Sequence, residues 1–187
     1  IVMGKVDAVE LYPRSDATFR TTGYTEWYRY LNCGYRVAVA GGTDKMAAGT
    51  PLGGNRTYAY LGQQEFNFPN WAAAVRAGRT FATSGPLIEF RADGHTPGDE
   101  IRLGPGGGTV EVVVEATGYV PFHRVEVVYN GKVVASREDR AGTRQMKLSE
   151  RVTVPGPGWL AARCGSRAPS TRFGVAAHTS AVYLTVP

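Results

Sequence analysis

Turn signals divide the second half of this 187-residue chain into short segments, and their spacing constrains the fold more than any other feature. The signals are Asp93-Gly94, the glycine-rich run 104–108, Asn130-Gly131 and the stretch 155–158. Apolar and polar residues alternate between them, as in strands with one buried face. We therefore predict an immunoglobulin-like β-sandwich over residues 87–187. Its strands are expected at 87–91, 100–103, 109–116, 124–129, 132–136, 146–154, 158–164 and 181–186.

The Asn130-Gly131 pair gives the clearest local prediction. Both residue types accept the positive φ angles that a two-residue type I′ turn requires, and apolar segments flank the pair. The sequence therefore predicts a β-hairpin centred on these two residues.

Residues 1–86 follow a different pattern, in which helices alternate with strands expected at 6–11, 36–40, 57–61 and 79–83. A helix over 26–33 would be capped by Thr25 and ended by Gly34, and a second helix is expected over 67–78. Trp27, Tyr30 and Leu31 recur at helical spacing, either as a buried stripe or as an aromatic platform for a ligand. This order of elements is typical of an α/β fold, so a domain boundary is expected near residue 86.

Charge and hydropathy limit the classes of partner that the chain can bind. The net charge of +5 comes from 21 basic and 16 acidic residues, with no run of Lys or Arg of the kind that follows phosphates. The sequence therefore argues against nucleic-acid binding. No stretch of 18 apolar residues occurs, so no membrane span is expected.

The cysteines and histidines are scattered. Cys33 and Cys164 lie 131 positions apart and are expected to be free thiols. His95 and His123 are expected in solvated loops, whereas His178 could face the neighbouring domain. None of the three histidines has a second metal-type ligand at a diagnostic spacing.

An acidic residue follows the strand expected at 36–40, in the sequence Gly41-Gly42-Thr43-Asp44. An acid placed there is a common metal ligand or general base of α/β enzymes. Arg56, just before the next strand, could pair with Asp44 or clamp an anionic substrate group. The alternative is a structural salt bridge or an aspartate that caps a turn.

Several segments together resemble the carbaryl-hydrolase-like (CehA/McbA) family of the polymerase and histidinol phosphatase (PHP) superfamily. They are VDAVELYP at 6–13, the run 27–58 with its GGTD and GNRTY motifs, NWAAAVRAGRTFATSGPLIEF at 70–90, GHTPGDEI at 94–101 and AAHTSAVYLTV at 176–186.

The resemblance implies a hydrolase that cleaves a small-molecule ester or phosphoester with water activated by divalent metal ions such as Zn, Mn or Fe. Asp44 matches a late metal-binding aspartate, and Arg56 is assigned a catalytic, substrate-binding role. Met46 stands where many superfamily members carry a ligand histidine. The family's early His-x-His motif and middle ligands have no counterpart here. We therefore expect residues 1–86 to be the last part of a PHP-type barrel, inactive alone, from a secreted or periplasmic enzyme.

Two further expectations concern partners. Half a barrel leaves strand edges open, which favours pairing with the sandwich or with a second copy of the chain. The alternative to a hydrolase is a non-enzymatic module whose sandwich binds carbohydrate or protein, with Tyr119, Phe122 and Tyr129 as candidate contact residues.

Overall fold

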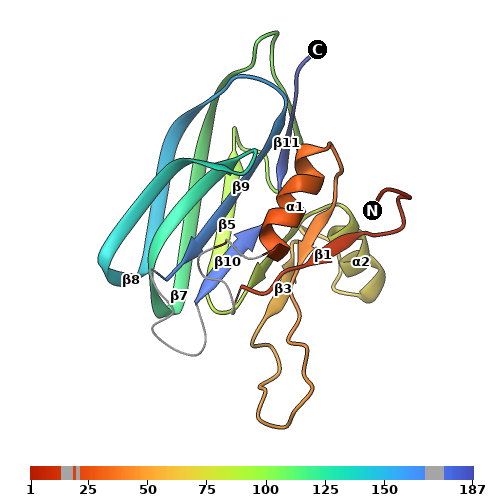
Figure 1. Ribbon diagram of the computed structural model, residues 1–187, viewed down its shortest axis with the longest axis vertical. Helices are drawn as coiled ribbons and strands as arrows, with labels where there is room; N and C mark the ends of the chain where they lie inside the picture. Colours follow the sequence, from red (N-terminus) through yellow and green to blue (C-terminus); the bar gives the residue numbers. More distant parts are fainter. Residues whose placement is uncertain (14–18, 20–21, 167–174) are drawn as a thin grey trace.

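The computed structural model describes residues 1–13, 19, 22–166 and 175–187, and it is mainly β-sheet (Figure 1). The first elements are β1 (Ala8–Glu10), α1 (Thr22–Asn32), β2 (Ala38–Ala40), β3 (Arg56–Ala59), α2 (Phe68–Arg76) and β4 (Thr80–Thr83). Seven strands follow: β5 (Leu87–Ala92), β6 (Glu100–Arg102), β7 (Gly108–Tyr129), β8 (Lys132–Val154), β9 (Gly158–Gly165), β10 (Ala176–Thr179) and β11 (Val182–Thr185).

The strands form an antiparallel, sandwich-like arrangement. The first half of β7 pairs with β5 and with the end of β8, whereas its second half pairs with β9 and with the start of β8. The second layer continues from β9 through β10 and β4 to β3. The main core between the layers consists of inward-facing residues such as Phe90, Val112 and Leu160. An apolar face on each sheet therefore stabilises the sandwich.

The hairpin at Asn130-Gly131 is confirmed. The two residues have φ angles of 48° and 86°, and Tyr129 pairs with Lys132 across the turn. The strands on either side are longer than predicted, because the segments expected at 109–116 and 124–129 join into β7, and those at 132–136 and 146–154 join into β8. Shifts of register between Thr117 and Arg124 absorb the irregular residues that had suggested a break.

Helix α1 begins earlier than the sequence predicted. The proposed cap, Thr25, lies inside the helix, which already includes Tyr24. Tyr24 is fully buried and extends the apolar stripe of Trp27, Tyr28 and Leu31 by one turn, so packing overrides the capping signal. Gly34 follows the helix at φ 83°, as expected of a glycine after a helix end.

A second core lies beneath α1 and joins the two halves of the sequence. It contains Trp27 and Val39 from the first half and Trp159, Ala161 and Ala176 from the second. The β-sheet also continues across residue 86, because β4 pairs with β10. Strand β10 falls where no strand was expected. The two predicted segments therefore share both a sheet and a core.

Helix α2 has the N-terminal cap that its sequence predicts. The side chain of Asn67 accepts a hydrogen bond from the backbone N–H of Asn70 at 2.9 Å, and Pro69 lies in the first turn. Neither α1 nor α2, nor any other helix in the described ranges, is long and apolar enough to cross a membrane.

Loss of the cap should weaken the fold measurably. We expect Asn67→Ala to lower the free energy of unfolding by about 1 kcal/mol, because one amide of the first turn loses its acceptor. Asn67→Asp retains an acceptor and should stay close to the original stability. Urea denaturation followed by circular dichroism measures the difference, and equal losses in the two variants would contradict this role of the cap.

Candidate functional site

One acidic side chain closes a strand of the parallel β1–β2 pair, and another lies in the loop that follows β2. β1 and β2 run parallel with Glu10 opposite Ala40, so both strands end at the same edge. The Glu10 carboxylate lies so close to Gly42 that a side chain there would collide with it. Tyr12 donates a hydrogen bond to Glu10 at 3.2 Å. The glycine therefore lets an exposed carboxylate fold back over the loop that leads to Asp44.

Asp44 itself is exposed and has a φ of 48°, a conformation that aspartate and asparagine adopt more readily than most residues. Burial, followed by the negative charges of Glu10 and Asp44, raises the pKa of Tyr12. Sequence reasoning had identified Asp44 but not Glu10, although Glu10 closes a recognisable strand.

The predicted ion pair between Arg56 and Asp44 does not form among the residues that the structure describes. Arg56 instead donates to the carbonyl oxygens of Gly53 at 2.9 Å and Gly85 at 3.3 Å, and to the hydroxyl of Tyr58 at 3.2 Å. These bonds fix the loop before β3 to the turn after β4. The physical reason is that nearby backbone acceptors on both sides and the Tyr58 hydroxyl hold the guanidinium group in this orientation, although some of its five N–H groups stay unused. Its catalytic, substrate-binding role stays a prediction.

The ligand set at the β1–β2 edge is small. Over the described ranges, no three His, Cys, Asp or Glu side chains come together in a way that could hold a metal ion. Glu10 and Asp44 are hard oxygen donors suited to a divalent cation, but a catalytic zinc site uses three protein ligands. These residues fit part of a metal site, and we derive no catalytic step from them.

The three histidines have different surroundings. His95 has its Nδ1 3.1 Å from the carbonyl oxygen of Asp93 in a turn, as expected of a loop histidine. The expectation that His123 lies in a solvated loop is wrong, because this residue lies half-buried within β7. His178 is completely buried in β10 and faces α1, where its Nε2 lies 2.6 Å from the Tyr28 hydroxyl. The expectation that His178 faces the other part of the chain is therefore confirmed.

His178 belongs to a buried chain of hydrogen bonds. Its Nδ1 lies 2.8 Å from the carbonyl oxygen of Thr179, which can only accept, so Nδ1 carries the proton and Nε2 accepts from Tyr28. Arg163 donates to the Tyr28 oxygen at 3.1 Å and pairs with Glu126 at 2.6 Å. Burial and the charge of Arg163 lower the pKa of His178 to about 3. This imidazole is neutral and structural.

The cysteines are free, as expected. Cys33 is exposed just beyond α1, whereas Cys164 is fully buried in β9. Burial raises the pKa of the Cys164 thiol to about 12. Cys164 is therefore an apolar core residue rather than a nucleophile.

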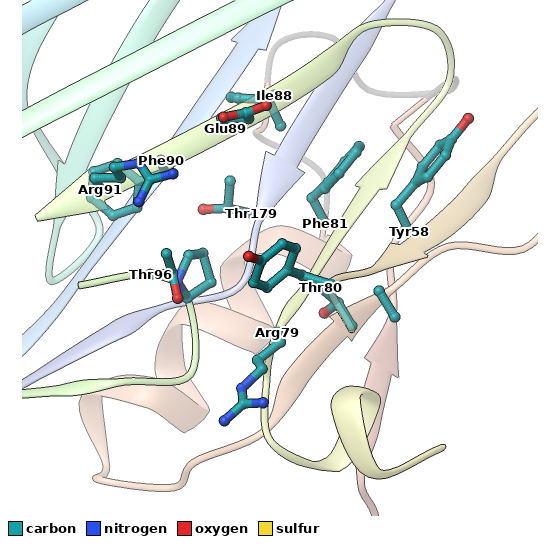
Figure 2. Close-up of a pocket in the computed structure, with 13 residues that line it drawn as sticks. Tyr58, Arg79, Thr80, Phe81, Ile88, Glu89, Phe90, Arg91, Thr96 and Thr179 are labelled. Atoms are coloured by element: carbon teal, nitrogen blue, oxygen red, sulfur yellow. The ribbon is translucent and has the colours of Figure 1, made fainter. Parts of the chain in front are cut away.

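A cavity of about 450 Å³ opens between β5 and the antiparallel pair of strands β3 and β4 (Figure 2). The rings of Tyr58 and Phe81 stack with centroids 4.9 Å apart on one side, and Arg79, Glu89 and Arg91 lie around the opening. The side chains of Thr57 and Thr80 point to the opposite face of the β3–β4 pair, where they form hydrogen bonds with Gly41 and Val39 of the β2 segment. The cavity and the acidic strand edge therefore lie on opposite faces of β3 and β4.

Sequence reasoning missed this cavity because its residues come from separate segments with no common motif. The alternation in Arg79–Phe81 and Leu87–Arg91 was the available signal, but it also fits ordinary sandwich strands. The aromatic residues proposed instead do not form a platform. Tyr119 is exposed, whereas Phe122 is buried in the main core. Tyr129 packs against that core, and its hydroxyl donates to the carbonyl oxygen of Gly156 at 3.0 Å.

Comparisons with known proteins leave the family open. No protein-family model matches the chain, and no curated protein matches it either. Among solved structures, a lytic polysaccharide monooxygenase of Jonesia denitrificans, determined by neutron crystallography, is similar at 12% sequence identity. The match covers 86% of this chain and 93% of that chain with a TM-score of 0.32. A likeness at this level supports no conclusion about activity.

Proposed function

We propose that this chain is the C-terminal part of a metal-dependent hydrolase that cleaves an ester or phosphoester. The observation that supports the proposal is that Glu10, at the end of β1, lies against Gly42 in the loop that leads from β2 to Asp44. Ligand sites of α/β enzymes lie at the carboxyl ends of parallel strands. In this proposal the β1–β2 pair is assigned to the end of a PHP-type barrel.

Each residue has a definite role in this proposal. Asp44 and Glu10 hold a divalent cation, which would activate water for attack on the substrate. Further ligands come from outside the described residues, so residues 1–187 alone are inactive. Arg56 holds the loop that carries Asp44 through its bond to Gly53, and its remaining N–H groups are available to an anionic substrate. We also propose a secreted or periplasmic location, as in the resemblance.

Asparagine at position 44 tests the proposal without disturbing the backbone, because asparagine also tolerates a positive φ. In the longest natural gene product that contains this chain, we expect Asp44→Asn to reduce Mn²⁺-dependent hydrolysis of p-nitrophenyl phosphate or p-nitrophenyl acetate by at least about 100-fold. This magnitude is typical of the loss of an important catalytic contact. Manganese titration should show weaker binding in the same variant.

Glu138→Gln, an exposed change on β8, serves as the matched control and should leave the rate unaltered. The proposal fails if Asp44→Asn retains the original rate and metal affinity. It also fails if residues 1–187 alone hydrolyse these esters with Mn²⁺ or Zn²⁺ at a rate that Asp44→Asn does not change.

A further inference from the structure

Strand β5 has one edge that is not paired. Asp93 donates its N–H to Glu111 of the β7 segment, whereas Ala92 exchanges two hydrogen bonds with His95 on the other side. Successive residues of an antiparallel strand point their N–H and C=O groups to opposite edges. Ile88 and Phe90 alternate in the same sense as Ala92 along β5. Their N–H and C=O groups therefore point away from β7, toward the cavity that the two residues help to line.

These backbone groups are buried, and no residue in the described part of the chain pairs with them. Ile88 and Phe90 are only 2% and 3% exposed, and no hydrogen bond from their outward N–H or C=O groups to any described residue exists. Buried backbone groups in native proteins are almost always paired with protein, water or ligand. The two residues offer two donor–acceptor pairs about 7 Å apart, which is the repeat of an extended chain.

The cavity beside this edge suits side chains as well as backbone. Figure 2 shows Phe81 and Tyr58 side by side on the neighbouring strands, with Thr179 between them and β5. The cavity volume of about 450 Å³ lies within the range of ligand sites, which are mostly apolar with a few polar groups. An aromatic wall next to a strand edge can accept alternate side chains of an added strand.

The charges around the opening favour an anionic occupant. Arg79 and Arg91 are exposed, and neither guanidinium group forms an ion pair with another described residue. Glu89 is the acidic side chain that lines the cavity beside them. Glu115 on β7 is also near enough to feel the charge of Arg91, but it already pairs with Lys147. Two guanidinium groups and one carboxylate therefore line the cavity, and the excess positive charge attracts a carboxylate by charge-assisted hydrogen bonds.

We propose that this cavity binds a short, extended peptide segment with acidic side chains, which adds to β5 at Ile88 and Phe90. The peptide backbone satisfies the buried edge groups, one side chain packs on Phe81 and Tyr58, and an acidic side chain pairs with Arg79 or Arg91. The pairing of Ala92 with His95 closes one end of the edge, so the bound segment is short. This site is independent of the acidic edge at Asp44.

Binding can be tested with the probe acetyl-Val-Glu-Val-Glu-Val-amide by calorimetry on the whole chain. We expect the probe to bind at least about tenfold more tightly than its Lys-for-Glu counterpart and than a version methylated at every backbone nitrogen, which cannot donate to a strand edge. In nitrogen–proton NMR spectra the amide signals of Ile88 and Phe90 should shift on binding. The Arg79→Gln, Arg91→Gln double variant should weaken binding at least about tenfold.

Arg140→Gln, an exposed change on β8, is the control and should bind the probe with unchanged affinity. Equal affinity for the methylated peptide would overturn strand addition, and equal affinity for the lysine peptide would overturn the role of the arginines. Glutarate, a dicarboxylate without a peptide backbone, should bind far more weakly. If it binds as tightly as the peptide, the site is a simple anion pocket and the proposal is wrong.

Discussion

Trp27→Ala is expected to destabilise the whole chain by about 3–5 kcal/mol, which is the usual range for removal of a buried tryptophan. Trp27 has no exposed surface, and its Nε1 donates to the carbonyl oxygen of Val37 at 3.1 Å. Its ring contacts His178 and Trp159 at centroid distances of 5.2 and 6.2 Å. The variant therefore loses packing against both halves of the sequence and leaves a buried carbonyl without its donor.

The shared core makes this variant a test of cooperativity. Urea denaturation followed by far-ultraviolet circular dichroism and by fluorescence should give coincident transitions, both shifted to lower urea. Trp71→Ala provides the control: Trp71 is half-buried on α2 and belongs to neither core cluster, so its loss should cost clearly less. An unchanged sheet transition in Trp27→Ala would show that residues 1–86 unfold separately from the sandwich.

Local signals were sufficient where one short motif determines the backbone. Asn130-Gly131 specified its turn and Asn67 its helix cap, because the side chains act within a few residues of their own position. The same reasoning failed for β10, since Ala176–Thr179 carries a histidine and no alternation, and it becomes a strand by pairing with β4 and β9. The pairing with β4 depends on residues nearly a hundred positions away in the sequence.

The candidate sites show the same division. Asp44 was found because glycines and a strand end precede it in the sequence. Glu10 comes to lie against Gly42 only through the parallel register of β1 and β2. The cavity exists only because β5 lies across from the antiparallel β3–β4 pair. Arg56 was placed near the correct loop, but its actual acceptors, Gly53 and Gly85, are backbone atoms that no side-chain pattern reveals.

His178 should make the stability of the fold depend on pH below about 6.5. An unfolded histidine has a pKa near 6.5, whereas burial and the nearby Arg163 lower the native pKa to about 3. Between these values the unfolded chain binds a proton that the native chain excludes, so stability falls as the pH falls. The contribution of the neutral His178 to the free energy of unfolding is fully present above about pH 6.5. As the pH falls below that value, this contribution is lost with a slope approaching about 1.4 kcal/mol per pH unit.

The variant His178→Gln removes this titration but keeps a polar side chain near Tyr28. At pH 7 we expect it to be less stable than the original chain, because it loses the fit among the rings of Phe19, Trp27 and Tyr28. At pH 4.5 the difference in free energy of unfolding between the two chains should narrow by an amount on the order of 2–3 kcal/mol. The reason is that only the original chain takes up a proton at position 178 on unfolding, which favours its unfolded state.

Urea denaturation at the two pH values measures this narrowing, and Gln145→Ala, an exposed change on β8 that alters no titratable group, should preserve the pH dependence of the original chain. Parallel pH profiles for His178→Gln and the original chain would mean that His178 either titrates normally in the native state or is protonated there. If the imidazole were protonated, Nε2 would carry a proton and Tyr28 could not donate to it, whereas the bond from Nδ1 to Thr179 would keep its direction.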